Sequence, residues 1–112
     1  MGQSFLGIDI GCETIKLVEL RRSPAGLEWT RGELIPHGKE PARALREALA
    51  GPEWAGLGGA AVTGRLSSLV SLPRIPARAA QARGLRFRHG DAPATIVSIG
   101  SHGFSVLELR GG

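Results

Sequence analysis

The segment from Leu6 to Leu20 limits the folds open to this chain more than any other part of the sequence. Apolar residues recur at alternate positions over residues 5–10 and again over 14–20, and this alternation predicts two strands. A short turn that begins with Gly11 separates them. Glycine tolerates positive φ and lets the backbone approach another group closely. The segment therefore predicts a β-hairpin with a tight turn at its tip.

This turn carries groups that can bind a phosphate. Backbone amides of residues 11–14 can converge on an anion as a nest. Asp9, at the carboxyl end of the first strand, is a hard oxygen ligand of the kind that hydrated Mg²⁺ takes, and it is also the candidate catalytic residue. The simpler alternative is an ordinary β-hairpin with a glycine turn. The candidate phosphate-binding residues of this segment are Gly11, Cys12, Glu13, Thr14 and Lys16.

The same pattern of strand, turn and strand returns near the end of the sequence, in residues 95–109. An apolar strand leads into a turn with a glycine at each end, and a second apolar strand follows. The second hairpin therefore offers a second candidate phosphate turn. Its candidate residues are Gly100, Ser101, His102 and Gly103.

The two segments resemble the phosphate-1 and phosphate-2 motifs of the actin/hsp70/sugar-kinase superfamily of ATPases. The resemblance implies two pseudo-symmetric halves that grip ATP and Mg²⁺ from opposite sides. This chain departs from the family pattern, which has aspartate at Ser98, often glycine at Ser101, and usually serine or threonine at Cys12. A serine hydroxyl can reach a metal through bound water but does not neutralise its charge. Either the site is degenerate, or Asp9 carries the metal alone, with Ser98 reaching it through water.

The sequence between the two hairpins predicts alternating strands and helices. Pro41 suits the first position of a helix, Gly51 and Pro52 end that helix, and Gly84 is the predicted cap of a later one. Further strands are predicted over residues 27–35 and 59–63, and helices over 41–50, 66–70 and 76–83.

The predicted order of elements, β-β-β-α-β-α-α-β-β, is that of one ribonuclease-H-like half of the actin-like ATPases. The expected fold class is therefore α/β with a mixed sheet. We expect residues 1–92 to form the first actin-like subdomain and residues 93–112 to be the opening hairpin of the second. On this interpretation the sequence is the N-terminal portion of a longer protein.

The net charge of +4 comes from twelve arginines against two lysines, set against ten acidic residues. Five arginines lie between Arg74 and Arg88, in a stretch without acidic residues, and a nucleic-acid surface is one interpretation. They alternate with alanines in an amphipathic helical pattern, which favours a solvated helix face. Three Phe and two Trp are also few for stacking on single strands. We therefore expect no nucleic-acid partner, while a docking face for an acidic protein stays open.

Cys12 is the single cysteine of the sequence, so the chain has no intramolecular disulfide and no CxxC metal site. The N-terminus lacks a signal-peptide pattern and leads straight into the first predicted strand. No apolar run approaches the roughly twenty residues that a membrane helix needs. The sequence therefore predicts a cytoplasmic protein without membrane contact.

Within the superfamily, the chain most resembles the activases of 2-hydroxyacyl-CoA dehydratases and benzoyl-CoA reductases. The resemblance rests on residues 62–65 (VTGR) and 75–80 (IPARAA), in addition to the two hairpins. It implies an ATP-driven electron donor that forms a homodimer and serves an acyl-CoA dehydratase or reductase component. In that family one [4Fe–4S] cluster is held between subunits by cysteines that lie after the region represented here, and Cys12 does not match them. The parent is then an ATPase, and this portion alone is expected not to turn over ATP.

Two alternatives stay open. Actin-like assembly proteins of pilus or division machinery begin with a similar hairpin and third strand, and residues 6–35 fit them about as well. A degenerate regulatory or scaffold domain without nucleotide is favoured by Ser98 and Cys12. Tight binding of Mg·ATP by the full-length parent would separate an active site from a degenerate one, and its iron content would separate an activase from an assembly protein.

Overall fold

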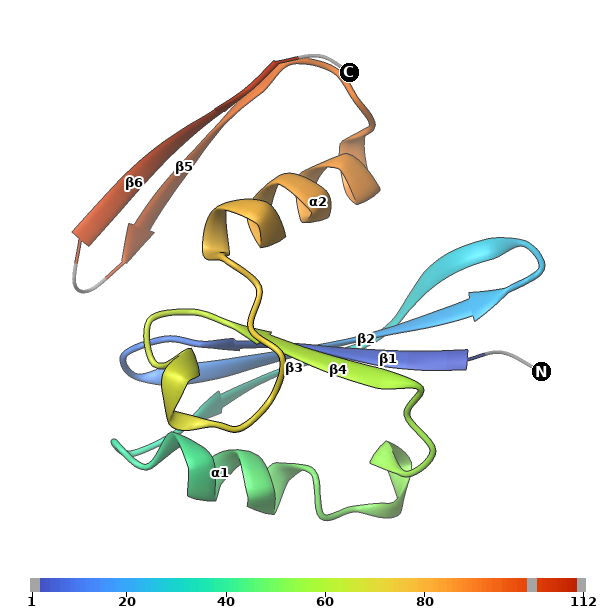
Figure 1. Cartoon of the computed structure of the whole chain (residues 1–112), viewed down its shortest axis with the longest axis vertical. Coiled ribbons are helices and arrows are strands. Elements are labelled where there is room, and N and C mark those ends of the chain that lie inside the picture. The colour runs from blue at the N-terminus through green and yellow to red at the C-terminus, as the bar shows by residue number, and fades with distance from the viewer. Residues whose placement is uncertain (1–2, 101–102, 111–112) are drawn as a thin grey trace. The chain divides into compact units, whose positions relative to one another are not determined.

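A computed structural model describes residues 3–100 and 103–110 of the chain. The chain divides into two compact units, Met1–Arg74 and Ile75–Gly112. Each unit combines strands with helix (Figure 1), so the predicted mixed α/β fold class is confirmed. None of the helices in the described residues is both long and apolar enough to cross a lipid bilayer.

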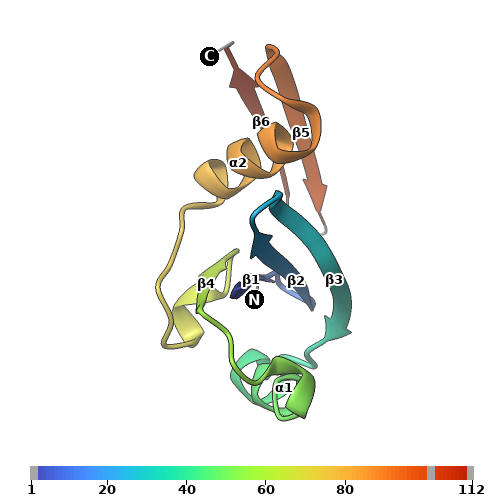
Figure 2. The ribbon, with the colours of Figure 1, turned by 90° about the vertical axis from the view of Figure 1, so that its right-hand side faces the viewer.

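The first unit is built on a mixed sheet. In its described part, the strands are β1 (Gln3–Ile10), β2 (Thr14–Ser23), β3 (Gly26–Pro36) and β4 (Gly59–Thr63), in the spatial order β3-β2-β1-β4. The first three form an antiparallel meander, and β4 pairs with β1 in parallel. Figure 2 shows the strands side by side with α1 on one face. All four strands were predicted from the sequence, within a few residues at their ends.

The core of this unit lies between one face of the sheet and the segment that follows β3. That segment contains α1 (Pro41–Ala48), which begins at the predicted proline, and the short 3₁₀ turn η1 (Pro52–Trp54). Alternate residues of the strands face this segment, as period-2 patterning requires. The buried apolar side chains are Leu6, Ile8, Ile10, Ile15, Leu17, Leu45, Trp54 and Val62.

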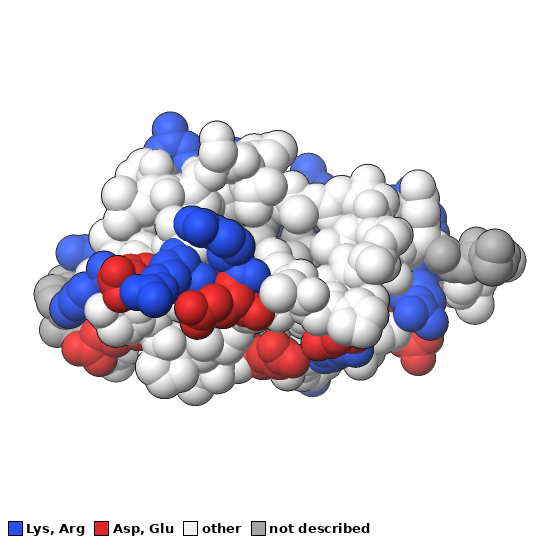
Figure 3. Space-filling model, turned by 90° about the horizontal axis from the view of Figure 1, so that it is seen from below, with Lys and Arg blue, Asp and Glu red and all other residues white. Residues whose placement is uncertain are grey.

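The outer face of α1 is charged in both signs. Arg43 forms exposed ion pairs with Glu40 at 3.6 Å and Glu47 at 3.4 Å. Figure 3 shows basic and acidic side chains next to one another on this face of the molecule. Exposed pairs of this kind contribute little to stability.

A buried acidic side chain lies on the core face of β2. Glu19 is 6% exposed, and its Oε1 accepts a hydrogen bond from the hydroxyl of Thr30 at 2.6 Å. The pairing of β2 with β3 shifts register between Glu19 and Leu20. The extra β3 residue at this bulge is Thr30, which is why its hydroxyl can reach back to Glu19.

Thr30→Val is expected to lower the free energy of unfolding by about 1 to 3 kcal/mol, because it leaves a buried carboxyl oxygen of Glu19 without a partner. Valine has nearly the shape of threonine, so packing changes little. Urea unfolding followed by tryptophan fluorescence measures the effect. Thr30→Ser keeps the hydroxyl and is the matched control. Equal stability of the valine and serine variants would contradict the role given to this hydrogen bond.

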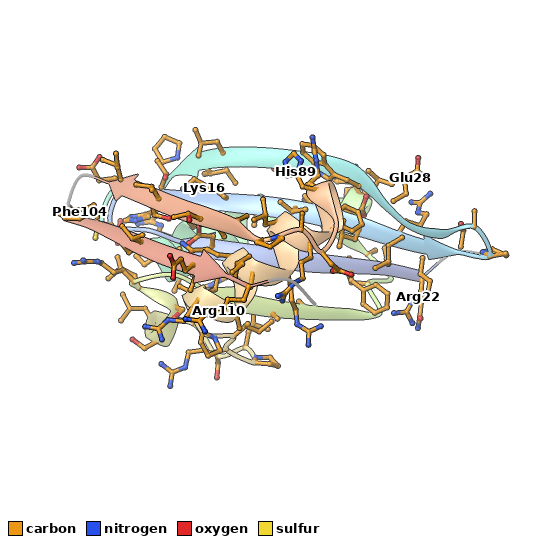
Figure 4. The ribbon with its side chains drawn as sticks, turned by 90° about the horizontal axis from the view of Figure 1, so that it is seen from above. Lys16, Arg22, Glu28, His89, Phe104 and Arg110 are labelled. Atoms are coloured by element: carbon orange, nitrogen blue, oxygen red, sulfur yellow. The ribbon has the colours of Figure 1, made fainter. Side chains whose placement is uncertain are left out.

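The second unit contains α2 (Ala77–His89) and a hairpin of β5 (Ala94–Gly100) and β6 (Gly103–Leu109). The hydroxyl of Ser98 accepts a hydrogen bond from Gln81 Nε2 at 2.9 Å, so this face of the hairpin lies against α2. The other face is apolar and exposed, and Figure 4 labels one of its side chains, Phe104, near the hairpin tip. The exposed apolar residues of this face are Val97, Ile99, Phe104 and Val106.

Two details of the predicted helices are wrong. The helix predicted over residues 66–70 is a single 3₁₀ turn, η2 (Ser67–Leu69). The turn does not continue as a helix because the chain returns to the sheet, where Arg74 forms a parallel bridge with Val62. The helix predicted over 76–83 runs on to His89, with Gly84 inside it. Gly90, at φ +78°, provides the C-terminal cap, and its N–H donates to Arg86 O.

Candidate functional site

The turn between β1 and β2 is closed by its own first residue. The N–H of Gly11 donates to the carbonyl of Thr14 at 2.9 Å. A Cβ at Gly11 would lie 3.4 Å from that same oxygen, at the limit of ordinary van der Waals contact. The N–H of Gly11 is therefore committed within the turn, although the sequence placed it among the anion donors. Gly11 contributes to the site by closing the turn through this hydrogen bond.

The carbonyl groups of the turn are held by the segment that follows β3. His37 Nε2 lies 2.8 Å from Gly11 O, and the backbone N–H of His37 donates to Glu13 O at 3.1 Å. The ammonium of Lys39 donates to the carbonyl of the intervening residue, Cys12, at 3.4 Å. Three consecutive carbonyl oxygens, of residues 11, 12 and 13, are thus bound from one side.

This arrangement fixes the direction of the N–H groups in the turn. In a planar trans peptide, the carbonyl of one residue and the N–H of the next point in opposite directions. The N–H groups of Cys12, Glu13 and Thr14 therefore point away from His37 and Lys39. Within the described residues, the N–H groups of Cys12 and Glu13 donate to no protein acceptor. Convergent N–H groups without protein partners form a nest for an anion.

Carboxylate and hydroxyl oxygens lie at the C-terminal ends of β1 and β4, the two strands that pair in parallel. Asp9, the penultimate residue of β1, lies 3.9 Å from the ammonium of Lys16, and both side chains are about half exposed, at 45% and 58%. Asp9 is also the parallel partner of Thr63 on β4. Thr63 Oγ1 is buried and has no hydrogen-bond partner in the described part of the chain. Gly64 lies against the Asp9 carboxylate so closely that a side chain would not fit.

These oxygens suit a hydrated magnesium ion. Mg²⁺ binds proteins through one or two carboxylates and keeps several of its waters. Asp9 supplies a carboxylate, and the unpartnered hydroxyl of Thr63 can accept or donate to a metal-bound water. Among the described residues, no group of three or more His, Cys, Asp or Glu side chains could hold a metal by itself. The donor set fits an ion that the protein shares with a phosphate ligand.

The second predicted turn belongs to the other unit. Gly100 and Gly103 are paired at the end of the β5–β6 hairpin. Ser101 and His102 lie outside the described residues. Ser98, the predicted water-mediated metal contact, is bonded to Gln81 in its own unit. Its role toward a metal stays a prediction.

Three residues of the site were not predicted from the sequence: His37, Lys39 and Thr63. Thr63 was expected only as part of a strand. The sequence carries a weak signal for the first two. Pro36-His37-Gly38 follows a strand and predicts a turn, and a histidine in a turn beside a phosphate segment is a candidate contact. Thr63 had no signal of its own, because its importance comes from the pairing of β4 with Asp9.

The chain has a mixed α/β fold, and its solved structural neighbours are proteins of the actin-like ATPase fold. In the first unit, a meander of three strands, a helix on one face and a fourth strand parallel to the first make up this fold. The Aquifex aeolicus PPX-GPPA enzyme shares this fold, with a TM-score of 0.61 at 12% identity over 99% of this chain and 50% of that one.

Two of the solved structures that match are a component and an activator of CoA dehydratases. Component A of (R)-2-hydroxyglutaryl-CoA dehydratase from Acidaminococcus fermentans matches with a TM-score of 0.74 at 21% identity, over 96% of this chain and 43% of that one. The activator of 2-hydroxyisocaproyl-CoA dehydratase from Clostridium difficile, solved with bound ADPNP, matches with a TM-score of 0.70 at 26% identity, over 98% of this chain and 41% of that one. The resemblance to these activators, predicted from the sequence, is confirmed at the level of the fold.

The chain spans half or less of the length of these solved proteins. No protein-family model matches it, and no curated protein matches it by sequence.

Proposed function

We propose that this chain is the nucleotide-phosphate-binding N-terminal portion of an ATP-driven activase of CoA-dependent dehydratases or reductases. One observation carries the proposal: the turn after β1 has its carbonyls bound from one side and its N–H groups turned to the other. Phosphate oxygens accept hydrogen bonds from such N–H groups. The activator solved with ADPNP supports ATP as the ligand.

Each residue of the site then has a distinct task. The N–H groups of Cys12, Glu13 and Thr14 bind phosphate oxygens, and Lys16 adds positive charge beside them. Asp9 holds Mg²⁺, directly or through its water, and thereby orients the phosphate for transfer. The second hairpin, with its turn at residues 100–103, belongs to the half that grips the nucleotide from the opposite side.

The partners follow from the same proposal. The remainder of a longer chain covers the exposed apolar face of the β5–β6 hairpin, since this chain spans half or less of the solved proteins that it matches. The full-length parent is a cytoplasmic homodimer that serves a dehydratase or reductase component. A [4Fe–4S] cluster, where the parent has one, uses cysteines other than Cys12.

Amide chemical-shift mapping with Mg·ATP tests the proposal. The largest shifts are expected in residues 9–16, with a dissociation constant of about 1 mM, because a half-site held by phosphate contacts binds weakly and loses affinity in salt. Asp9→Asn should remove the dependence on Mg²⁺ and leave the shifts at residues 12–14 with ATP alone. Largest shifts at residues 78–88 would instead identify the arginines of α2 as the binding surface.

The 112 residues alone are expected not to hydrolyse ATP. Phosphoryl transfer depends on positioning and on charge placed around the γ-phosphate from several directions, and this chain has only the first half of that arrangement. Phosphate release should equal that of buffer. ATPase activity that Asp9→Asn abolishes would overturn this part of the proposal.

A degenerate regulatory domain is the second candidate, favoured by Ser98 and Cys12 at positions where the ATPases have aspartate and serine or threonine. It predicts that Mg·ATP shifts no amide of residues 9–16, even in the full-length parent. An actin-like assembly protein predicts binding of Mg·ATP by a parent that contains no iron.

A further inference from the structure

We propose that His37 is a positioning residue that locks the β1–β2 turn in its anion-binding form. This inference rests on the proposed function, since it assigns a role at the same phosphate site. His37 follows β3 directly and is only 4% exposed. The only titratable groups that contact the turn from this segment are His37 and Lys39, within the described residues.

The hydrogen bonds of the ring define its tautomer. His37 Nδ1 accepts the backbone N–H of Lys39 at 3.1 Å, so Nδ1 carries no proton. A neutral imidazole has its proton on the other nitrogen. Nε2 is therefore the donor to Gly11 O, at 2.8 Å. Both ring nitrogens are used, and the acceptor role of Nδ1 together with the donor role of Nε2 defines the tautomer with its proton on Nε2.

The backbone around the ring is shaped to make this contact. The N–H of Glu40 donates to His37 O at 2.9 Å, and the two residues between them have positive φ, +55° at Gly38 and +67° at Lys39. Positive φ at both central positions is the pattern of a type I′ turn, which glycine and asparagine favour. Lys39 is the one non-glycine residue with positive φ in the described part of the chain. Its strained backbone aims its N–H at Nδ1 and brings its ammonium to Cys12 O.

The hydrogen bond from His37 to Gly11 O decides whether the N–H or the carbonyl of the next peptide group faces the ligand. A flip of the peptide between Gly11 and Cys12 changes ψ of Gly11 and φ of Cys12, and glycine at the first position removes the side-chain restraint on one of these two angles. If this peptide rotated by half a turn, a carbonyl oxygen would replace the Cys12 N–H in the nest and would repel a phosphate. The bond from His37 Nε2 holds this carbonyl on the opposite side. His37 thus acts on the ligand through the orientation of a backbone group and touches no ligand atom.

Two variants separate this role from simple packing. His37→Gln keeps a side-chain N–H donor for Gly11 O, whereas His37→Leu fills the space without one. Titration with inorganic phosphate, followed by the amide shifts of Cys12 and Glu13, is expected to show His37→Leu weakened about three- to tenfold, the loss that corresponds to one hydrogen bond. His37→Gln should bind within about twofold of the unmodified chain. Thermal unfolding of both variants reports any general loss of stability.

The ring nitrogens of the unmodified chain give a readout that needs no variant. Their chemical shifts should show a protonated Nε2 and an unprotonated Nδ1. A proton on Nδ1, or equal phosphate affinity of the glutamine and leucine variants, would overturn the role of His37 while leaving the phosphate site in place. If phosphate shifts no amide of residues 12–14 in the unmodified chain, the proposed function itself fails, and this inference fails with it.

Discussion

Gly64→Ala is expected to destabilise the first unit by about 3 kcal/mol or more, a large effect for a single methyl group. An added Cβ would lie 2.5 Å from Asp9 Oδ1 and 2.7 Å from the backbone N of Ile10, and closer still to Ile10 O. The carboxylate could move aside. The backbone of Ile10 could not, since β1 is paired on both sides, with β2 and with β4. The backbone of Gly64, at φ +103°, adds strain for any L residue with a side chain.

Gly26→Ala is the matched control for this experiment. Gly26 also has positive φ, at +119°, but an added Cβ would meet no atom within 4 Å. Both variants therefore carry backbone strain, and only Gly64→Ala adds the collision with β1. Urea unfolding monitored by Trp29 and Trp54, both in the first unit, measures each. Equal losses in the two variants would contradict the close approach of Gly64 to Asp9.

Ile15→Ala is expected to cost about 3 to 4 kcal/mol, the range for removing a large aliphatic side chain from a well-packed core. Ile15 is fully buried at the start of β2, and it pairs directly with Ile10, which is also fully buried. The two residues flank the phosphate turn and face the core. The loss is large because packed neighbours on the sheet and on α1 cannot collapse into the space that is left.

Val18→Ala, on the same strand, is the control for Ile15→Ala. Val18 lies on the opposite face of β2 and is 38% exposed, so its loss should stay below about 1 kcal/mol. The slope of the unfolding free energy against urea should be unchanged in both variants, which would show that the unfolded state is the same. A small effect of Ile15→Ala would contradict the burial of this end of the hairpin.

The fold could be predicted from the sequence because local patterns agree with the tertiary structure. Residues at alternate positions of β1 and β2 are buried, and Pro41 begins α1 as its fixed φ allows. Predictions failed where the deciding contact is distant in sequence. Gly84 is a residue typical of a helix cap, yet α2 continues through it. The turn η2 is followed by Val70, whose backbone is extended, and the chain then runs to the bridge between Arg74 and Val62.

The candidate site could be predicted only in part, for the same reason. Asp9 and the turn after it are contiguous, so their chemistry is visible in one short segment. The direction of the N–H groups depends on His37 and Lys39, which approach from the end of β3. The unpartnered hydroxyl of Thr63 reaches Asp9 only through the parallel pairing of β4. Sequence patterns identify the donors, whereas the tertiary structure decides which way they face.

The parallel pairing of β1 with β4 has a consequence for how the molecule assembles. The hairpins β1–β2 and β2–β3 join residues that are near in sequence, and such contacts form in microseconds. The register of β1 with β4 joins residues about fifty positions apart, Asp9 with Thr63 among them, so a long loop must close first. We therefore expect the meander and its turn to form early, and the corner that contains Thr63 and Gly64 to dock late. Folding completes at the same place where the phosphate and its metal ion would bind.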